Sequence, residues 1–211
     1  MTLDLFAPPT ETLAEGALLL RGFALDAAPD LLAAITAVAA AAPFRHLVTP
    51  GGFRMSVAMT NCGGYGWVSD RRGYRYDPVD PENGRPWPPL PPLFLDLARR
   101  AAAAAGFSDF RSDVCLINRY LPGTRLTLHQ DKDEGDFTQP IVSVSLGLPA
   151  TFLWGGLARA DKAQRIPLAH GDIVVWGGPS RLRYHGIAPL KPGSHPLLGE
   201  QRLNLTFRRA R

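Results

Sequence analysis

The chain of 211 residues is long enough for one domain with a substantial core and short for two independent ones. Its 45% hydrophobic content favours a folded protein, and the longest apolar stretch, 31–42, is well below the roughly 20 residues that cross a bilayer. The start, Met1 to Asp4, lacks a basic region followed by an apolar one, as a secretory signal would have. We therefore expect a cytoplasmic monomer that does not enter a membrane, with Cys62 and Cys115 as reduced thiols.

The basic residues are unusual in kind. The net charge is +4, and of the 23 basic residues only Lys132, Lys162 and Lys191 are lysines, so 20 are arginines. Arginine binds phosphates and carboxylates with two parallel hydrogen bonds and stacks on rings, which suggests an anionic partner such as nucleic acid. A GC-rich coding sequence would produce the same bias, so composition alone does not decide.

The first half of the chain predicts few regular elements. Residues 1–16 read as irregular, and 61–92 has no period and seven prolines between Pro78 and Pro92. A run as long as 61–92 without a period inside a domain is typical of a functional lid or binding loop. Regular elements are predicted as strands at 17–21 and 53–59 and as helices at 29–42 and 93–105, the second ended by Gly106.

After Gly106 the pattern changes to short strands separated by Gly and Pro turns. Eight of them are predicted, at 114–120, 125–129, 141–148, 151–154, 165–168, 172–176, 182–185 and 202–208. Such spacing without alternating helices favours an antiparallel sandwich or jelly roll. The predicted fold class is α+β, with helices preceding a β core.

The sharpest chemical feature is a pair of possible metal ligands at the end of a predicted strand. His129 and Asp131 are two positions apart and so face the same way. A second histidine, His185, ends another predicted strand. Two histidines and one carboxylate can occupy one face of an octahedral metal and leave three positions open, as in non-haem Fe(II) oxygenases. An isolated His-x-Asp is weak evidence, and His46, His170 and His195 lack this spacing and read as structural.

The last predicted strand has one polar and one apolar face. Its polar residues alternate with Leu203, Leu205 and Phe207; they are Arg202, Asn204, Thr206 and Arg208. Two arginines on an inward face need anions, and a small diacid bound between them would supply these. An exposed edge strand with solvated arginines is the alternative. On an earlier strand, Asn118 and Tyr120 share a face and could bind the same anion, or pack in the core.

Together these residues resemble the AlkB family of Fe(II)- and 2-oxoglutarate-dependent dioxygenases that dealkylate nucleic acids. The resemblance extends upstream through Thr49 to Gly52, Met55 to Gly63 and Trp67, and covers nearly the whole chain. It implies a double-stranded β-helix core over 111–211, preceded by helices and a nucleotide-recognition lid in 1–110. It also implies that His129, Asp131 and His185 bind iron, and that 2-oxoglutarate is held by five further residues, namely Asn118, Tyr120, Arg202, Asn204 and Arg208.

The activity implied is direct repair. With Fe(II), 2-oxoglutarate and O2, an N-methyl group on a base such as 1-methyladenine or 3-methylcytosine is oxidised. Formaldehyde, succinate and CO2 are released. The substrate would be single- or double-stranded alkylated DNA, with RNA as a further option.

The segment 67–76 interleaves rings with guanidinium groups, the mixture expected where a base is extruded and bound. The resemblance makes Trp67 one wall of the base site with His129 opposite. It assigns Tyr74, Arg75 and Tyr76 to the nucleotide and Arg159 to a further substrate contact. Asp133 could face the same cavity and favour a cationic methylated base, although the sequence alone favours a solvated acidic turn formed by Asp133, Glu134 and Asp136.

Three other functions compete with repair. A 2-oxoglutarate oxygenase acting on a small molecule or protein side chain would use identical iron ligands. A non-catalytic damage sensor would bind methylated strands without forming succinate. A zinc hydrolase is less favoured because no general base is recognisable and the carboxylate-binding arginines would have no purpose.

Overall fold

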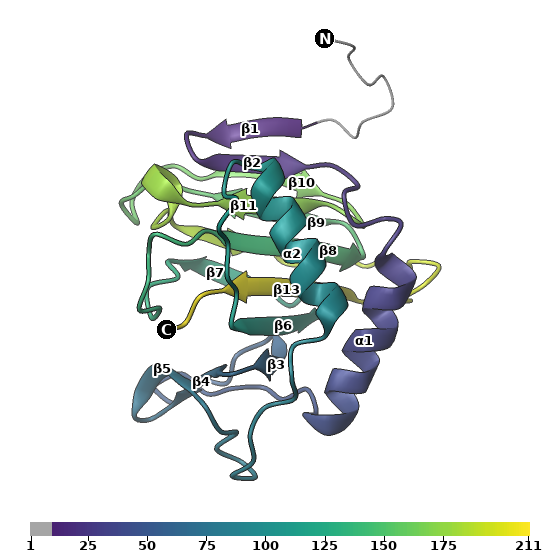
Figure 1. The fold of residues 1–211 in the computed structure, drawn as a ribbon, viewed down its shortest axis with the longest axis vertical. Coiled ribbons are helices and arrows are strands. Elements are labelled where there is room, and N and C mark those ends of the chain that lie inside the picture. The colour runs from purple at the N-terminus through teal and green to yellow at the C-terminus, as the bar shows by residue number, and fades with distance from the viewer. Residues whose placement is uncertain (1–9) are drawn as a thin grey trace.

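The computed structural model describes residues 10–211 (Figure 1). Two α-helices are present in this range, α1 (Ala28–Ala41) and α2 (Pro92–Ala104). The strands are β1 (Thr10–Ala14), β2 (Ala17–Leu20), β3 (Ala58–Gly63), β4 (Gly66–Asp70), β5 (Gly73–Asp77), β6 (Val114–Tyr120), β7 (Leu126–His129), β8 (Ile141–Gly147), β9 (Ala150–Trp154), β10 (Gln164–Leu168), β11 (Ile173–Trp176), β12 (His185–Ile187) and β13 (Arg202–Arg208). A short 3₁₀ turn, Gly178–Ser180, follows β11.

The strands form three sheets, and every pairing is antiparallel. The seven-stranded sheet has the order β1-β2-β11-β8-β13-β6-β3, and the four-stranded sheet has the order β10-β9-β12-β7. Strands β4 and β5 form a separate hairpin. The prediction of an antiparallel β core without parallel crossovers is therefore confirmed.

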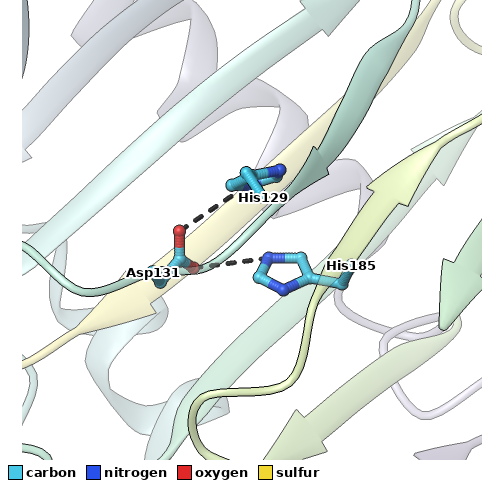
Figure 2. Close-up of side chains that lie close together, drawn as sticks. All are labelled: His129, Asp131 and His185. Carbon is cyan, nitrogen blue, oxygen red and sulfur yellow. Dashed lines mark ion pairs between the residues drawn. The ribbon is translucent and has the colours of Figure 1, made fainter. Parts of the chain in front are cut away.

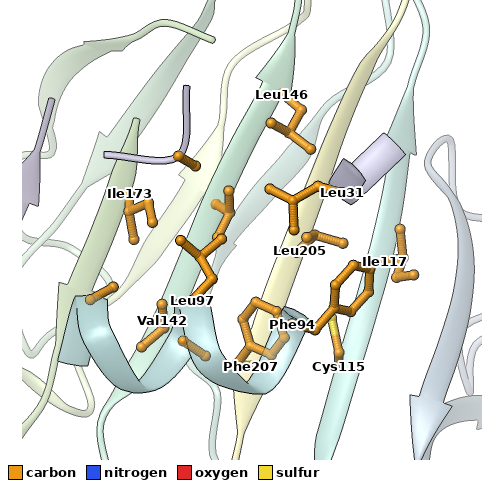
Figure 3. Close-up of a cluster of buried hydrophobic side chains, with 14 of the residues drawn as sticks. Leu31, Phe94, Leu97, Cys115, Ile117, Val142, Leu146, Ile173, Leu205 and Phe207 are labelled. Carbon is orange, nitrogen blue, oxygen red and sulfur yellow. The ribbon is translucent and has the colours of Figure 1, made fainter. Parts of the chain in front are cut away.

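The helices cover the outer face of the seven-stranded sheet (Figures 1 and 3). Leu205 and Phe207 of β13 are fully buried there, and the Phe207 ring meets Phe94 of α2 edge to face at 5.9 Å. This contact explains the apolar face of β13. Because side chains alternate along a strand, its polar face is turned the other way, toward the four-stranded sheet.

A second core lies between the two sheets. Phe152 and Trp154 of β9 and Trp176 of β11 pack together, with ring centroids 5.7 to 6.1 Å apart. Tyr120 of β6 belongs to the same cluster and is 1% exposed. The inward polar side chains of β13 therefore lie beside an aromatic layer that excludes water, rather than on a solvated edge.

Several predicted boundaries are wrong. Residues 10–14 are not irregular but form edge strand β1, because they pair with the apolar strand β2; residues 1–9, with the predicted lack of a secretory signal, lie outside the described part. The strand expected at 53–59 begins only at Ala58, since residues 50–51 form a turn that Phe53 closes onto Thr49 and residues 56–57 form a bend. Within 61–92, which showed no period, the chain forms the β4–β5 hairpin.

A further boundary error concerns His185. The strand predicted at 182–185 instead begins at His185 and continues to Ile187, and 182–184 follow the 3₁₀ turn.

The two cysteines lie directly opposite each other on β3 and β6, both free and buried. Burial raises the pKa of the Cys115 thiol well above its usual value. Between residues 10 and 211, no helix is both long and apolar enough to cross a membrane.

Candidate metal centre and substrate site

The two histidines are brought together by pairing of β7 with β12. His185 is opposite His129 and Ile187 is opposite Leu126. The two pairs are therefore three positions apart along β7 but only two apart along β12. The extra residue is a β-bulge, which turns His129 to the same side as the inward-facing Leu126. Gly186 makes room for it: a Cβ there would lie 2.6 Å from the Leu126 carbonyl oxygen. The bulge and the glycine together aim both imidazoles into the space between the sheets.

Asp131, just beyond the end of β7, completes the cluster (Figure 2). Its two carboxylate oxygens lie 3.7 Å from His129 Nε2 and 3.5 Å from His185 Nε2. One ligand atom from each of the three residues lies within 4.8 Å of the others. This is the donor set of two imidazoles and one carboxylate that non-haem iron uses, so the predicted convergence of His129, Asp131 and His185 is confirmed.

The second nitrogen of each imidazole fixes its orientation. His129 Nδ1 lies 2.8 Å from the Thr127 carbonyl oxygen, and His185 Nδ1 lies 3.1 Å from that of Arg183. A carbonyl can only accept, so each Nδ1 donates its proton and leaves the Nε2 lone pair free for a metal. Burial and the neighbouring His185 lower the pKa of His129 to about 4. The ring is therefore neutral near pH 7, as a ligand must be.

The carboxylate of Asp131 is also held by an arginine from β13. Arg208 donates from Nη2 at 2.7 Å and from Nε at 3.0 Å to Asp131 Oδ2. Despite burial, which opposes ionisation, Arg208 and His185 keep the pKa of Asp131 well below its usual value. Asp131 is thus an anionic group at any pH near neutrality.

A buried ion network behind this pair was missed by the sequence reasoning. Glu134 and Arg181, only 2% and 3% exposed, lie 3.2 Å apart. Glu134 also accepts a 2.6 Å hydrogen bond from the Tyr76 hydroxyl and lies 3.4 Å from Arg208 Nε. The alternative that read Glu134 as part of a solvated acidic turn is therefore wrong. No local signal separates it from the half-exposed Asp133, because its cationic partners come from distant strands.

The polar face of β13 continues onto its neighbour β6 in the same sheet. Arg202 is paired with Tyr120 and Asn204 with Asn118. The Asn118 amide donates to Asn204 Oδ1 at 3.3 Å, and the Arg202 guanidinium lies 4.9 Å from the Tyr120 ring centroid. All four side chains are buried, which excludes the solvated-edge alternative.

Arg202 has donors without acceptors. It is 1% exposed and donates from Nη2 to Ser145 Oγ, whereas its Nε and Nη1, and the Asn118 Oδ1 atom, are buried without a hydrogen-bond partner. A buried guanidinium without an anion is costly, and burial lowers its pKa. The missing partner is an anion with several oxygens, so the residues present fit a carboxylate of 2-oxoglutarate.

The aromatic side of the site is built by the β4–β5 hairpin. Trp67 stacks on Tyr74 with ring centroids 5.5 Å apart and an 11° interplanar angle. The Trp67 indole donates to Asp133 Oδ2 at 2.8 Å, and the Trp67 backbone is held by Asn61. Because Asp133 follows Asp131 by two positions, this bond ties the hairpin to the cluster of His129, Asp131 and His185.

Of the remaining predicted substrate residues, Arg75 and Tyr76 are held by contacts within the protein, and Arg159 lies on a groove. Arg75 forms a two-pronged ion pair with Asp70, at 3.0 and 3.1 Å, and Tyr76 is buried against Glu134. Arg159 is exposed and lines an open groove of about 330 Å³ with Arg125 and Arg165. The three remaining histidines, His46, His170 and His195, are not among the three clustered ligands.

Comparison with known proteins agrees with this geometry. The family model described as "2OG-Fe(II) oxygenase superfamily" matches residues 16–208. The chain belongs to this superfamily. It is 60% identical over 211 residues to "Alpha-ketoglutarate-dependent dioxygenase AlkB" of Escherichia coli K12, covering 99% of this chain and 98% of that one. The protein of the same description from Salmonella typhimurium is 62% identical with the same coverage.

A solved structure confirms the fold of this oxygenase. "The structure of OsALKBH1" superposes with a TM-score of 0.84 at 30% identity, covering 95% of this chain and 100% of that chain. The chain is therefore an Fe(II)- and 2-oxoglutarate-dependent dioxygenase, and its cofactor, cosubstrate and oxidant are Fe(II), 2-oxoglutarate and O2. The predicted family, reaction class and cofactors are confirmed.

Proposed function

We propose that this dioxygenase removes N-alkyl groups from nucleic-acid bases such as 1-methyladenine and 3-methylcytosine, releasing formaldehyde, succinate and CO2. The observation that supports it most directly is the combination of a His129–Asp131–His185 donor set with the β4–β5 hairpin, which Trp67 connects to the same cluster through Asp133. A human relative, 33% identical over 126 residues, is named "Nucleic acid dioxygenase ALKBH1".

The iron ligands in this proposal are His129, Asp131 and His185. Bound iron, with 2-oxoglutarate and O2, supplies the oxidation of the N-methyl group, which no side chain could perform alone. The Thr127 and Arg183 carbonyls hold the imidazoles in the metal-binding tautomer. In the structure, Arg208 contacts the Asp131 carboxylate. When Asp131 binds the cation, Arg208 would instead contact a carboxylate of 2-oxoglutarate.

For 2-oxoglutarate we propose Asn118, Tyr120, Arg202, Asn204 and Arg208. Arg202 and Arg208 stand at the two ends of the inward face of β13 and suit the two carboxylates of a diacid. Arg202 would use its unpaired Nε and Nη1, and the aromatic layer around Tyr120 excludes water from that end. Desolvation strengthens the ionic contacts, so one small anion is held firmly in the core.

For the base we propose a site between Trp67 and His129. Tyr74 covers one face of Trp67, so only the other face remains for a base. Tyr74 and Arg75 would contact the nucleotide backbone and Arg159 a more distant part of the strand, whereas the buried Tyr76 would hold Glu134 and Arg208 in place.

Selectivity for damage is assigned to Asp133. Methylation at N1 of adenine or N3 of cytosine makes the base cationic, and Asp133 places a carboxylate beside Trp67. We expect Asp133→Ala to lose turnover of methylated bases while still binding iron. Unchanged discrimination between methylated and plain DNA would refute this role.

Within the chain, we propose that residues 1–110 provide nucleotide recognition through the lid segment, and that 111–211 provide the iron and 2-oxoglutarate ligands. The biological substrate would be alkylated DNA in single or double strands, with RNA as a further option, handled by a cytoplasmic monomer.

The deciding experiment is anaerobic reconstitution with Fe(II) and 2-oxoglutarate, followed by O2 and a methylated or plain oligonucleotide. We expect formaldehyde only from the methylated strand, with matching succinate. His185→Ala should abolish both products, whereas His195→Ala, a histidine outside the metal cluster, should not. Succinate without formaldehyde from any methylated strand would point instead to a small-molecule or protein substrate.

A further inference from the structure

One side chain on the hairpin side of the molecule has no role in the site described above. Phe53 is 76% exposed, the highest value among the large exposed hydrophobic residues of the described chain. None of the ring pairs found within 10–211 includes it. A lone apolar side chain on a surface is ordinary, so the argument depends on how it is held and where.

Hydrogen bonds fix the backbone of the turn that carries this ring. Phe53 closes a tight turn in which its carbonyl accepts from the Thr49 amide at 2.9 Å and its own amide donates to Thr49 Oγ1 at 3.1 Å. Gly52, with φ +86, supplies the left-handed residue that the turn needs. Below the turn, Val48 bridges Arg54 and the Met55 amide donates to the Leu47 carbonyl. The ring is therefore presented on an ordered support.

The turn is tied to both sides of the proposed base site. On one side, Ser69 of β4 donates to the Val48 carbonyl at 2.7 Å, two residues from Trp67. On the other, Ser56 donates to the Arg125 carbonyl at 3.0 Å, next to the β7 strand that ends in His129. Residues 48–56 therefore join the strand of Trp67 to the strand of His129, the two walls proposed for the base.

The residue that follows Phe53 in the chain carries a positive charge. Arg54 is exposed, and no carboxylate of the described residues forms an ion pair with it. An exposed ring on one residue and an unpaired guanidinium on the next is a combination that can bind single-stranded nucleic acid, with the ring on a base and the cation on a phosphate.

We infer that Phe53 stacks on a nucleobase adjacent to the one that enters the site, while Arg54 contacts the phosphate between them. This inference rests on the proposed function, because it needs a nucleic-acid strand across the Trp67–His129 site. It makes Phe53 a specificity residue for strands over free nucleotides: a mononucleotide has no neighbouring base to stack.

The test uses the whole protein with Fe(II) and 2-oxoglutarate under anaerobic conditions, so that binding is measured without turnover. The probe is an oligonucleotide with 1-methyladenine next to 2-aminopurine, whose fluorescence falls when it stacks. Phe53→Ala should weaken binding about tenfold, as expected for one lost base–aromatic stack. In the bound complex, the 2-aminopurine fluorescence should be lower with wild-type protein than with Phe53→Ala, and Phe53→Tyr should restore both the affinity and the lower fluorescence.

Two controls separate this contact from a general defect. Free 1-methyl-deoxyadenosine monophosphate should bind Phe53→Ala and wild type equally. Leu197→Ala, which removes a side chain that is 58% exposed on a different loop, should leave both measurements unchanged. For Arg54→Gln, the slope of log affinity against log salt should fall by about 0.7, the value for one phosphate of a single strand.

Failure of the inference differs from failure of the proposed function. Admitting O2 to the wild-type complex tests the latter, since formaldehyde must appear. If formaldehyde appears, two results overturn the stacking role. One is that Phe53→Ala binds the oligonucleotide as tightly as wild type does, and the other is that its affinity for the mononucleotide falls as much as its affinity for the oligonucleotide. A wild-type dimer that Phe53→Ala converts to a monomer would also overturn it, because the ring would then contact a second copy. If Phe53→Ala folds poorly, Phe53→Leu takes its place, because it keeps an apolar side chain but has no ring. It should show the same loss of oligonucleotide binding, about tenfold.

Discussion

The buried ion network around Glu134 makes a strong prediction about stability. Four charges, those of Asp131, Glu134, Arg181 and Arg208, balance one another in the metal-free protein at ion-pair separations of 2.7 to 3.4 Å. Glu134→Gln keeps the size and removes one negative charge, leaving a net positive charge beside an almost fully buried Arg181. Removing one partner of a buried pair costs about 3–5 kcal/mol.

That loss is large enough to measure by thermal unfolding. At about 2–4 °C per kcal/mol for a chain of this size, the melting temperature should fall by roughly 6–20 °C. Asp96→Asn is the matched control, because it breaks an Asp96–Arg100 pair in which both side chains are more than half exposed, and exposed pairs contribute about 0–1 kcal/mol.

A second variant tests the cause. Glu134→Gln combined with Arg181→Met removes both charges and should recover part of the loss. Recovery stays partial because Arg181 also donates to the Asp131 and Gln139 carbonyls. A melting temperature for Glu134→Gln within 2 °C of wild type would show that the network does not stabilise the fold.

Four further outcomes are expected. His185→Ala should lose Fe(II) binding in equilibrium dialysis, and stoichiometric binding by this variant would contradict its role as a ligand. Arg202→Met should raise the KM for 2-oxoglutarate at least tenfold while iron binding persists, and an unchanged KM would place the cosubstrate elsewhere. Burial and the adjacent His195 lower the pKa of His170 below 6.5 in the folded state, so the unfolded chain binds its proton first and stability falls as the pH drops below 6.5. Urea unfolding of His170→Asn should show a smaller fall with pH than wild type. Gly186→Ala should separate β12 from β7 and reduce iron affinity, because its Cβ would meet the Leu126 carbonyl at 2.6 Å, and normal affinity would show that the bulge tolerates it.

Much of the fold and of the metal centre could be predicted from the sequence because the signals are local. The alternation along 202–208 predicts one apolar side that packs in a core and one inward polar side, and the structure has both. The His129-x-Asp131 spacing, the distant His185 and the short strands after Gly106 were likewise legible. Resemblance to a family then selected iron among the metals that such a donor set could bind.

Other features depend on contacts between distant segments. Residues 10–14 form a strand because β2 is beside them, and Phe53 closes a turn because 45–49 folds back on 53–59. The β4–β5 hairpin has no hydrophobic period, since its order comes from cross-strand pairs and from Trp67 binding Asp133. Local propensity cannot reveal pairing partners that are remote in the chain.

The sequence by itself determined which groups were available: two imidazoles, a carboxylate, an arginine-bearing strand and a segment rich in rings and guanidinium groups. Only the tertiary structure decided which acid is buried, that Arg208 and Arg181 flank Glu134, and that a bulge in β7 turns His129 toward His185. The reason is that residue type and spacing set the direction of a side chain along one strand, whereas charge environment and burial depend on neighbours that come from elsewhere in the chain.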